Sequence, residues 1–179
     1  MEQSREFKIK ICLLGDGAVG KTSLIKKFVY DEFDDKYIVT LGAKTSKKFV
    51  SLPNPKDRSP VDITLMISDI MGQTDVKGIH DAYLIGTKGA IMVCDFTRKS
   101  TLENLKNWME RLLKVCGEVP VVFVVNKYDL ILDAQFDFNA LQKLAEGYKA
   151  TAFVSSAKTG ENVEKVFHSL AERLMLSRV

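Results

Sequence analysis

The order of apolar segments along the chain constrains its fold more than any other feature. Short runs rich in β-branched residues alternate with longer segments whose apolar residues recur at helical spacing. Several short runs are almost continuously apolar, which is typical of parallel strands buried on both faces. This alternation predicts an α/β fold in which helices cover both faces of one sheet, giving three layers. The predicted strands are Phe7–Leu14, Phe49–Leu52, Val61–Ile67, Ala90–Phe96, Val119–Val125 and Ala152–Ser155, and the predicted helices are Lys21–Tyr30, Thr101–Val115, Asn139–Tyr148 and Glu161–Leu176.

The segment Leu52–Pro60 interrupts this alternation because it contains three of the four prolines in the chain. Proline has no N–H to donate to a β-ladder, so the segment is predicted to connect two strands rather than to form one. The runs on either side of it are then expected to pair as an antiparallel hairpin with a long tip. The sequence therefore predicts a six-stranded, mostly parallel sheet with one antiparallel edge strand.

The predicted helices carry further local signals. Ser100, followed three residues later by Glu103, indicates a capping box at the start of the second helix. We interpret Trp108 in the same helix as a packing residue rather than as part of a cofactor site. His168 lies off the apolar face of the last helix and needs no functional role. That face, which is predicted to pack on the sheet, consists of Val163, Val166, Phe167, Leu170 and Leu174.

Composition excludes several classes of protein. A chain of 179 residues is predicted to form one domain, and its net charge of +3 is too small to indicate nucleic-acid binding. Cys12, Cys94 and Cys116 form no Cys-x-x-Cys pair, so free thiols in a reducing, cytoplasmic setting are expected, with Cys12 and Cys94 buried. We expect no secretory leader and no membrane span. We also expect no membrane anchor, because the chain ends without a cysteine to prenylate.

One glycine-rich stretch predicts a phosphate-binding loop. Gly15-Asp16-Gly17-Ala18-Val19-Gly20-Lys21-Thr22 matches the pattern G-x-x-x-x-G-K-[ST], directly after a predicted strand and at the start of a predicted helix. The glycines allow backbone N–H groups to approach phosphate oxygens, and the helix N-terminus adds partial positive charge. Lys21 is expected to reach the β- and γ-phosphates, and the Thr22 hydroxyl to ligate Mg²⁺. The alternative is a glycine-rich turn with a surface lysine.

Three further stretches each follow a predicted strand: Asp69-Ile70-Met71-Gly72-Gln73, Asn126-Lys127-Tyr128-Asp129 and Ser155-Ser156-Ala157-Lys158. The carboxyl ends of parallel strands share one edge of a sheet, which is where α/β proteins bind ligands. Together with Gly15–Thr22, these stretches resemble the full motif set of the Ras superfamily of small GTPases, in the family's order. The resemblance covers essentially the whole chain and implies a single P-loop G domain over residues 1–179 that binds GTP, GDP and Mg²⁺.

Guanine recognition has a chemical basis in Asp129. Guanine presents two adjacent donors, N1–H and the N2 amino group, and one carboxylate can accept both of them. The alternative for Asp129 is a solvated loop or capping carboxylate. The resemblance implies that Asn126 braces the site, that Lys127 and Lys158 lie along the base, that the Ala157 N–H meets guanine O6 and that Phe33 packs across the base edge. The remaining members of the implied nucleotide-binding set are Ser23, Tyr37 and Ser156.

The resemblance also implies two switch segments that sense the γ-phosphate. Asp69 would hold Mg²⁺ through water, and Thr40 would join the Mg²⁺ shell only in the triphosphate state. Gly72 would donate its N–H to the γ-phosphate, and Gln73 would orient the attacking water. Loss of the γ-phosphate removes the partners of Thr40 and Gly72, so both segments would relax. The plainer alternatives are a loop or capping carboxylate for Asp69 and an ordinary β-rich residue for Thr40.

The chain departs from the family pattern at several places. Many relatives carry tryptophan and glutamate where this chain has Ser68 and Thr74, and Ile70-Met71 replaces the usual Thr-Ala. The first switch resembles Rab-type and Roc-type domains, but Asp69 follows Thr40 by 29 positions, which is longer than expected for Ras or Rab. These departures alter the surface that partner proteins would recognise. They are compatible with a prokaryotic or archaeal member of the family. Met71 is open to two interpretations, an adaptable contact surface or packing against the sheet.

No arginine occupies the sequence between Phe33 and Thr40, so the first switch supplies no arginine finger in cis. We therefore expect slow intrinsic hydrolysis that depends on an activating protein, together with exchange and effector proteins. Two alternatives remain at this stage. A GTP-binding interaction module that barely hydrolyses GTP would have no need of Gln73 or Thr40. A P-loop phosphotransferase would need arginines over a second substrate, whereas Arg98 and Arg111 are interpreted as surface residues.

Overall fold

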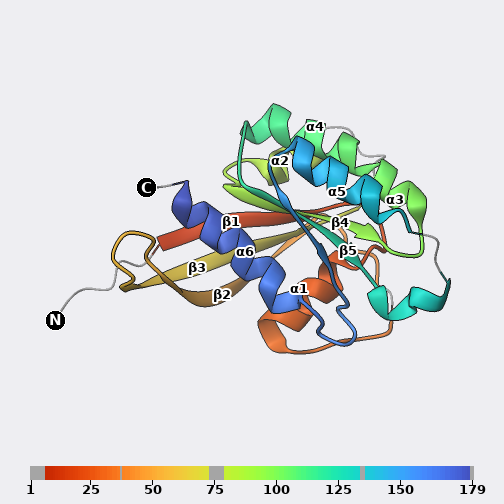
Figure 1. Ribbon diagram of the computed structural model, residues 1–179, viewed down its shortest axis with the longest axis horizontal. Coiled ribbons are helices and arrows are strands. Elements are labelled where there is room, and N and C mark those ends of the chain that lie inside the picture. The colour runs from red at the N-terminus through yellow and green to blue at the C-terminus, as the bar shows by residue number, and fades with distance from the viewer. Residues whose placement is uncertain (1–6, 37, 73–78, 134–135, 178–179) are drawn as a thin grey trace.

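The computed structural model describes residues 7–36, 38–72, 79–133 and 136–177. Its strands are β1 (Phe7–Leu14), β2 (Ala43–Pro53), β3 (Pro60–Ile70), β4 (Gly89–Asp95), β5 (Val121–Asn126) and β6 (Thr151–Val154). They form a six-stranded sheet in the order β2-β3-β1-β4-β5-β6 (Figure 1). Only the β2–β3 pair in this sheet is antiparallel. The predicted α/β fold, with one antiparallel edge strand, is confirmed.

Helices cover both faces of the sheet (Figure 1). On one face lie α1 (Lys21–Tyr30) and α6 (Val163–Leu176), and the predicted apolar face of α6 is buried there. The other face carries α2 (Ile79–Leu84), α3 (Lys99–Glu103), α4 (Leu105–Cys116) and α5 (Phe138–Gly147). Strand β1 supplies both cores, because its successive side chains alternate between the two faces. The mostly apolar sequence of this strand follows from that double burial.

Two predictions about the helices are wrong. The segment predicted as one helix from Thr101 is two helices, α3 and α4, which meet at Asn104. The Ser100 capping box does not form, because α3 already begins at Lys99. Thr101 stabilises this turn instead, since its hydroxyl lies 2.7 Å from the Arg98 carbonyl oxygen and accepts a hydrogen bond of 2.9 Å from the Asp95 N–H.

The β2–β3 hairpin is longer than predicted. β2 begins at Ala43 rather than at Phe49, and Pro53 pairs with Pro60 at the outer end of the hairpin. The prediction that all of Leu52–Pro60 lies outside the strands is therefore wrong. Proline is tolerated there because β2 is an edge strand and Pro60 lies beyond the part of β3 that pairs with β1.

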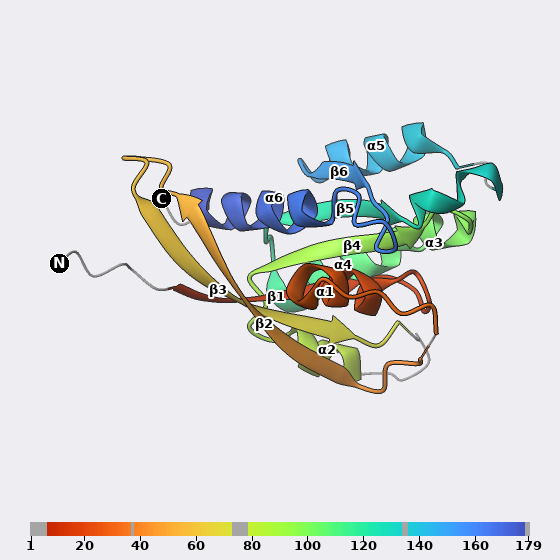
Figure 2. The same cartoon turned by 90° about the horizontal axis from the view of Figure 1, so that it is seen from below.

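The outer part of this hairpin packs against the end of α6. Figure 2 shows the hairpin extending past β1 toward the C-terminal end of that helix. Val50, Leu52 and Val61 of the hairpin belong to the same apolar core as Leu174 and Met175 of α6. Within the described ranges we find no candidate for a membrane-spanning helix.

Candidate functional site

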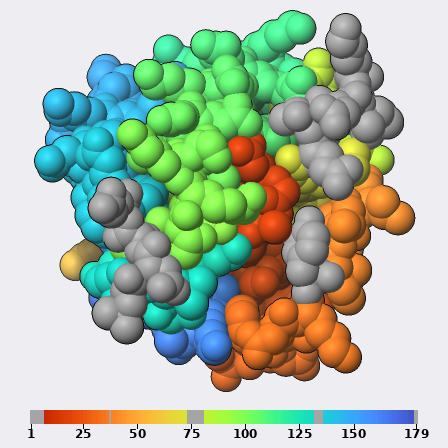
Figure 3. Space-filling model, turned by 90° about the vertical axis from the view of Figure 1, so that its right-hand side faces the viewer, coloured from red at the N-terminus to blue at the C-terminus, as the bar shows by residue number. Residues whose placement is uncertain are grey.

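The loops that follow β1, β3, β5 and β6 surround a cavity of about 320 Å³ at the carboxyl edge of the sheet. Figure 3 shows this edge of the molecule, with the first loop (red) in a hollow between the segment after α1 (orange) and the green and teal segments. The four motifs predicted from the sequence therefore meet in space. The lining includes Lys21, Thr22, Thr40, Gly72, Asn126, Lys127, Asp129, Ala157 and Lys158.

The phosphate-binding loop has the predicted strand–loop–helix setting. Lys21 is buried at the start of α1, and its Nζ donates to the carbonyl oxygens of Gly15 at 2.7 Å and Asp16 at 2.8 Å. Burial lowers the pKa of Lys21 to about 8, although Asp69 and Asp16 oppose the shift. Gly20 has φ +100°, and a Cβ at that position would overlap the side-chain amide of Asn126. The loop is thus packed directly against the base-recognition motif.

Asp16 connects the phosphate-binding loop to α4. Its Oδ1 accepts hydrogen bonds from Trp108 Nε1 at 2.9 Å and from Asn104 Nδ2 at 2.5 Å. The predicted packing role of Trp108 is confirmed by its burial, but the indole also has this polar role. The carboxylate of Asp16 therefore points toward α4, where it positions the phosphate-binding loop.

Asn126 connects three segments around the cavity. Its Nδ2 donates to the Val19 carbonyl at 3.0 Å, and its Oδ1 accepts from the Ala157 N–H at 3.1 Å. The side chain is almost completely buried at the end of β5. This geometry agrees with a bracing role for Asn126. The Ala157 N–H, predicted to face guanine O6, is directed at Asn126 here.

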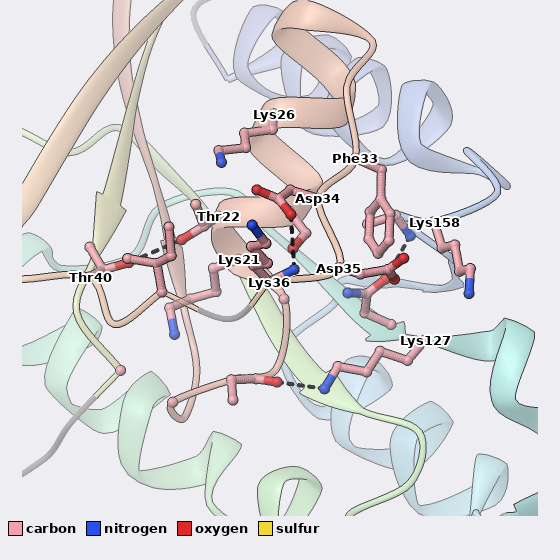
Figure 4. Close-up of a pocket in the computed structure, with 18 of the residues that line it drawn as sticks. Lys21, Thr22, Lys26, Phe33, Asp34, Asp35, Lys36, Thr40, Lys127 and Lys158 are labelled. Carbon is pink, nitrogen blue, oxygen red and sulfur yellow. Dashed lines mark hydrogen bonds between the residues drawn. The ribbon is translucent and has the colours of Figure 1, made fainter.

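Asp129 lines the cavity together with Phe33 and Lys158, and Figure 4 shows these last two residues on the opposite side of the cavity from Thr40. Asp129 Oδ1 accepts a hydrogen bond of 2.6 Å from the Ser156 hydroxyl, which itself accepts from the Thr159 N–H at 3.1 Å. Ser156 is fully buried, so it fixes the direction of an otherwise exposed carboxylate. An anchored carboxylate on the cavity wall suits a ligand with two adjacent donors.

Lys127 is held by a buried carboxylate that the sequence prediction missed. Its Nζ donates to the Ala18 carbonyl at 2.6 Å and to Asp95 Oδ2 at 2.7 Å. Asp95 also accepts from the Thr97 N–H and hydroxyl and from Arg98 Nε. Burial alone would raise the pKa of Asp95, but Lys127 and Thr97 outweigh it and hold the pKa below its ordinary value. Asp95 is the last residue of β4 and lies one residue before the end of the predicted strand Ala90–Phe96, which was the one available signal.

Three oxygen-bearing side chains converge beneath the phosphate-binding loop. The Thr22 hydroxyl donates to Asp69 Oδ2 at 2.5 Å and lies 3.0 Å from the Thr40 hydroxyl (Figure 4). Asp69 Oδ1 is buried and makes no hydrogen bond with any described residue. Burial raises the pKa of Asp69, although Thr22 and Lys21 oppose the shift. Hydroxyl and carboxylate oxygens around an unsatisfied buried acceptor fit a hard divalent cation such as Mg²⁺.

The second switch approaches the same loop. A Cβ on Gly72 would lie 2.5 Å from the Gly17 nitrogen and 2.5 Å from Lys21 Nζ, so only glycine allows this backbone contact. Gln73 and Tyr37, which were assigned to the catalytic and nucleotide-binding sets, lie outside the described residues.

Arg98 is exposed, as predicted for a surface residue, but it also contacts the phosphate-binding loop. Its guanidinium NH2 donates to the Gly17 carbonyl at 2.8 Å, and its Nε pairs with Asp95 at 3.0 Å. Residues 98 and 17 are 81 positions apart, so no local sequence signal could have shown this contact. Arg111, by contrast, pairs with Asp81 on the outside of α4.

Comparison with known proteins decides the family. The family model described as Ras family matches residues 10–176. Ras-related protein Rab-21 from Bos taurus is 31% identical over 172 residues, covering 96% of this chain and 75% of the relative. Rab-13 from Rattus norvegicus is 32% identical over 177 residues (98% and 84%), and Rab-1D from Dictyostelium discoideum is 34% identical over 172 residues (96% and 81%).

The chain belongs to the Ras family. It is a Rab-like small GTPase, and its enzymatic activity is the hydrolysis of GTP. The Ras-family fold explains why the four motifs meet at one sheet edge, since each follows a strand that ends there.

The departures of this Ras-family chain fall partly in the interior. Ser68 is buried on β3 opposite Thr45 and Cys12, so its own side chain presents no surface to a partner. Met71 is also buried, which supports packing rather than an adaptable contact surface. The proline-rich segment between the two switches forms the end of the hairpin that is remote from the cavity. Thr74, the other departure named from the sequence, lies outside the described residues.

Proposed function

We propose that this small GTPase is a Mg²⁺-dependent switch whose segments around Thr40 and Gly72 report the γ-phosphate to partner proteins. One observation carries the proposal: Lys21, Thr22, Thr40, Asp69 and Gly72 converge at one end of the cavity. The anchored carboxylate of Asp129 lines the same cavity as Phe33 and Lys158, which lie at the other end (Figure 4). A nucleotide in the cavity would thus be held by its guanine at one end and by its phosphates at the other.

The residues of the chain have separable roles in this proposal. Lys21 neutralises charge on the β- and γ-phosphates, while the backbone N–H groups of the loop bind phosphate oxygens. Gln73 orients a water molecule in line with the bond that breaks. When bound, Mg²⁺ would neutralise phosphate charge, and Thr22, Thr40 and, through water, Asp69 would hold it. Without the γ-phosphate, Thr40 and Gly72 lose their ligand contacts and the two segments are released.

Guanine specificity follows from the other end of the cavity. Asp129, oriented by Ser156, accepts from both guanine donors, and Asn126 keeps the base motif against the phosphate-binding loop. Phe33 and the stems of Lys127 and Lys158 flank the base. We further propose that residues 1–179 act as one G domain in the cytoplasm, where the free cysteines would stay reduced.

Intrinsic hydrolysis is proposed to be slow, because no arginine occupies the first switch. An activating protein would then speed hydrolysis, an exchange factor would release GDP, and an effector would bind the GTP state. The decisive experiment is extraction of nucleotide from the purified protein followed by a multiple-turnover GTPase assay with Mg²⁺. We expect bound GDP or GTP and slow phosphate release. Tight nucleotide binding without phosphate release would instead favour a non-hydrolysing GTP-binding module.

A further inference from the structure

Arg98 occupies an unusual place for an exposed arginine. Its side chain is 42% exposed, yet one end of its guanidinium donates to the Gly17 carbonyl at 2.8 Å in the phosphate-binding loop. The same guanidinium is held on its other side by Asp95, which is itself fixed by Lys127 and Thr97. The arginine therefore has a defined direction across the loop, although nothing buries it.

The peptide that Arg98 reaches borders the γ-phosphate end of the cavity. Gly72 packs against the nitrogen of Gly17, and Lys21 Nζ donates to the carbonyl of Asp16, one residue earlier. Arg98 therefore donates to the Gly17–Ala18 peptide, next to the Asp16–Gly17 peptide that Lys21 and Gly72 contact.

We propose that Arg98 supplies positive charge in cis to the transition state of GTP hydrolysis. The inference rests on the proposed hydrolysing switch. In that reaction, the oxygen of water bonds to the γ-phosphorus while the bond to the β–γ bridging oxygen breaks, and that oxygen leaves on GDP with its negative charge. One proton of the attacking water passes to an oxygen of the transferred phosphoryl group, so that inorganic phosphate is released as dihydrogen phosphate, which then equilibrates with solvent. Arg98 moves from the Gly17 carbonyl toward the charge that develops on the phosphate oxygens.

The contacts of Asp95 separate this role from a purely structural one. Asp95 already accepts hydrogen bonds from Lys127 and from the Thr97 N–H and hydroxyl, so the loop that carries Lys127 keeps its anchor when Arg98 moves. The exposed side of Arg98 leaves room for that movement. Because part of the guanidinium remains engaged with Asp95, the charge supplied in cis sets a slow intrinsic rate that an activating protein can still raise.

The test compares the full chain with Arg98→Ala, Arg98→Lys and Lys99→Ala. Lys99→Ala is the matched control, since it removes a neighbouring exposed positive charge whose weak pairing is with Glu103. Three quantities are measured: single-turnover GTP hydrolysis with saturating Mg²⁺, the dissociation rate of fluorescently labelled GDP, and the binding of aluminium fluoride to the GDP complex. The last quantity reports complementarity to the transition state rather than to the ground state.

We expect Arg98→Ala to slow GTP hydrolysis at least about tenfold. Fully aligned arginine fingers change the rate by much more, so we take about tenfold as the smallest effect that fits the proposal. GDP dissociation should change by less than about threefold, and aluminium fluoride binding should weaken with the hydrolysis rate. Arg98→Lys should recover part of the loss, and Lys99→Ala should match the wild type.

Two results would overturn the inference alone. One is Arg98→Ala hydrolysing GTP as fast as Lys99→Ala. The other is a fall in the hydrolysis rate of Arg98→Ala that is matched by an equal rise in its GDP dissociation rate. That result would show that Arg98 only holds the phosphate-binding loop in place. A wild-type protein that binds GDP but releases no phosphate would overturn the proposed switch and this inference together, so the two failures are distinguishable.

Discussion

The two ends of the nucleotide cavity are built in different ways. At the base end, Asn126 is 1% exposed, and its amide bonds the phosphate-binding loop on one side and the loop after β6 on the other. At the switch end, Leu41 is 85% exposed, and Thr40 meets the protein through the hydroxyl of Thr22. The base end thus contains a buried amide with both polar atoms paired, whereas the segment that carries Thr40 and Leu41 at the switch end is largely exposed.

This difference explains how one site can both bind and signal. Segments with few buried contacts open at low free-energy cost, whereas buried and hydrogen-bonded groups open only with much of the fold. The base end can therefore keep the nucleotide in either state, while the switch end changes with the γ-phosphate. Substitutions at the base end should then affect affinity for both nucleotides, and substitutions at the switch end should affect the rate or only one nucleotide.

The largest effect is expected for Asp129→Asn. The substitution removes two charge-assisted hydrogen bonds to guanine, each worth about 1.5–3 kcal/mol. GDP and GTP affinity should both fall about a hundredfold or more, since each 1.4 kcal/mol is tenfold. Preference should shift toward xanthine nucleotides, whose donor and acceptor pattern suits an amide. Titration with labelled GDP and xanthosine diphosphate measures both effects, and unchanged GDP affinity would disprove the base-recognition model.

Gln73→Leu should separate rate from affinity. Loss of the water-orienting amide is expected to slow single-turnover hydrolysis about tenfold to a hundredfold. This effect is smaller than the largest rate contributions of side chains that transfer a proton themselves. GDP and GTP affinity should stay within about twofold, because the amide contacts water rather than nucleotide. Gln142→Leu is the control, since Gln142 is an exposed residue on α5 that pairs with Glu146. Equal hydrolysis rates for the two variants would contradict the role of Gln73.

Thr22→Asn should discriminate between the two nucleotides. The asparagine cannot reproduce the short contacts of the Thr22 hydroxyl with Asp69 and Thr40. We expect affinity for GTP with Mg²⁺ to fall about tenfold and affinity for GDP to fall less. The reason is that binding of GTP depends more on the oxygen ligands of Mg²⁺ than binding of GDP does. Repeating the titrations with excess chelator supplies the control. If the preference for GDP persisted without Mg²⁺, Thr22 would act through packing rather than through the metal.

The smallest effect is expected for Asp95→Asn, measured as stability. A folded-state pKa below the ordinary value means that the Asp95 carboxylate stabilises the fold above the unfolded-state pKa of about 3.9. At neutral pH the variant should lose about 1–2 kcal/mol of unfolding free energy, in line with one charged hydrogen bond. The difference should shrink as pH falls through the folded-state pKa, below about pH 4. Urea unfolding of wild type, Asp95→Asn and the exposed-site control Asp62→Asn checks this.

The sequence predicted much of this architecture because its buried strands are short and nearly continuous in apolar residues. It missed the first half of β2, where Lys44, Thr45 and Lys47 give a polar pattern. An edge strand with an exposed face needs no apolar run, so periodicity cannot find it. It also missed α2, which spans six residues and is too short to show a helical period.

The candidate site shows the same division between local and non-local information. The four motifs were predictable because each is contiguous and follows a strand. The contacts that support them were not predictable, because Asp95 with Lys127, Arg98 with Gly17 and Trp108 with Asp16 join residues far apart in the chain. Such pairs depend on how the helices pack on the sheet, and a single sequence carries no direct record of that.

The amide of Asn126 has a consequence for nucleotide exchange. One side chain contacts the phosphate-binding loop at Val19 and the base loop at Ala157, so a displacement at either place strains the other. Coupling between two sites is reciprocal, so a shift of this amide from the phosphate side disturbs the base loop, and a shift from the base side disturbs the phosphate-binding loop. A catalyst of exchange can therefore work from the phosphate side alone, releasing the guanine without ever touching it.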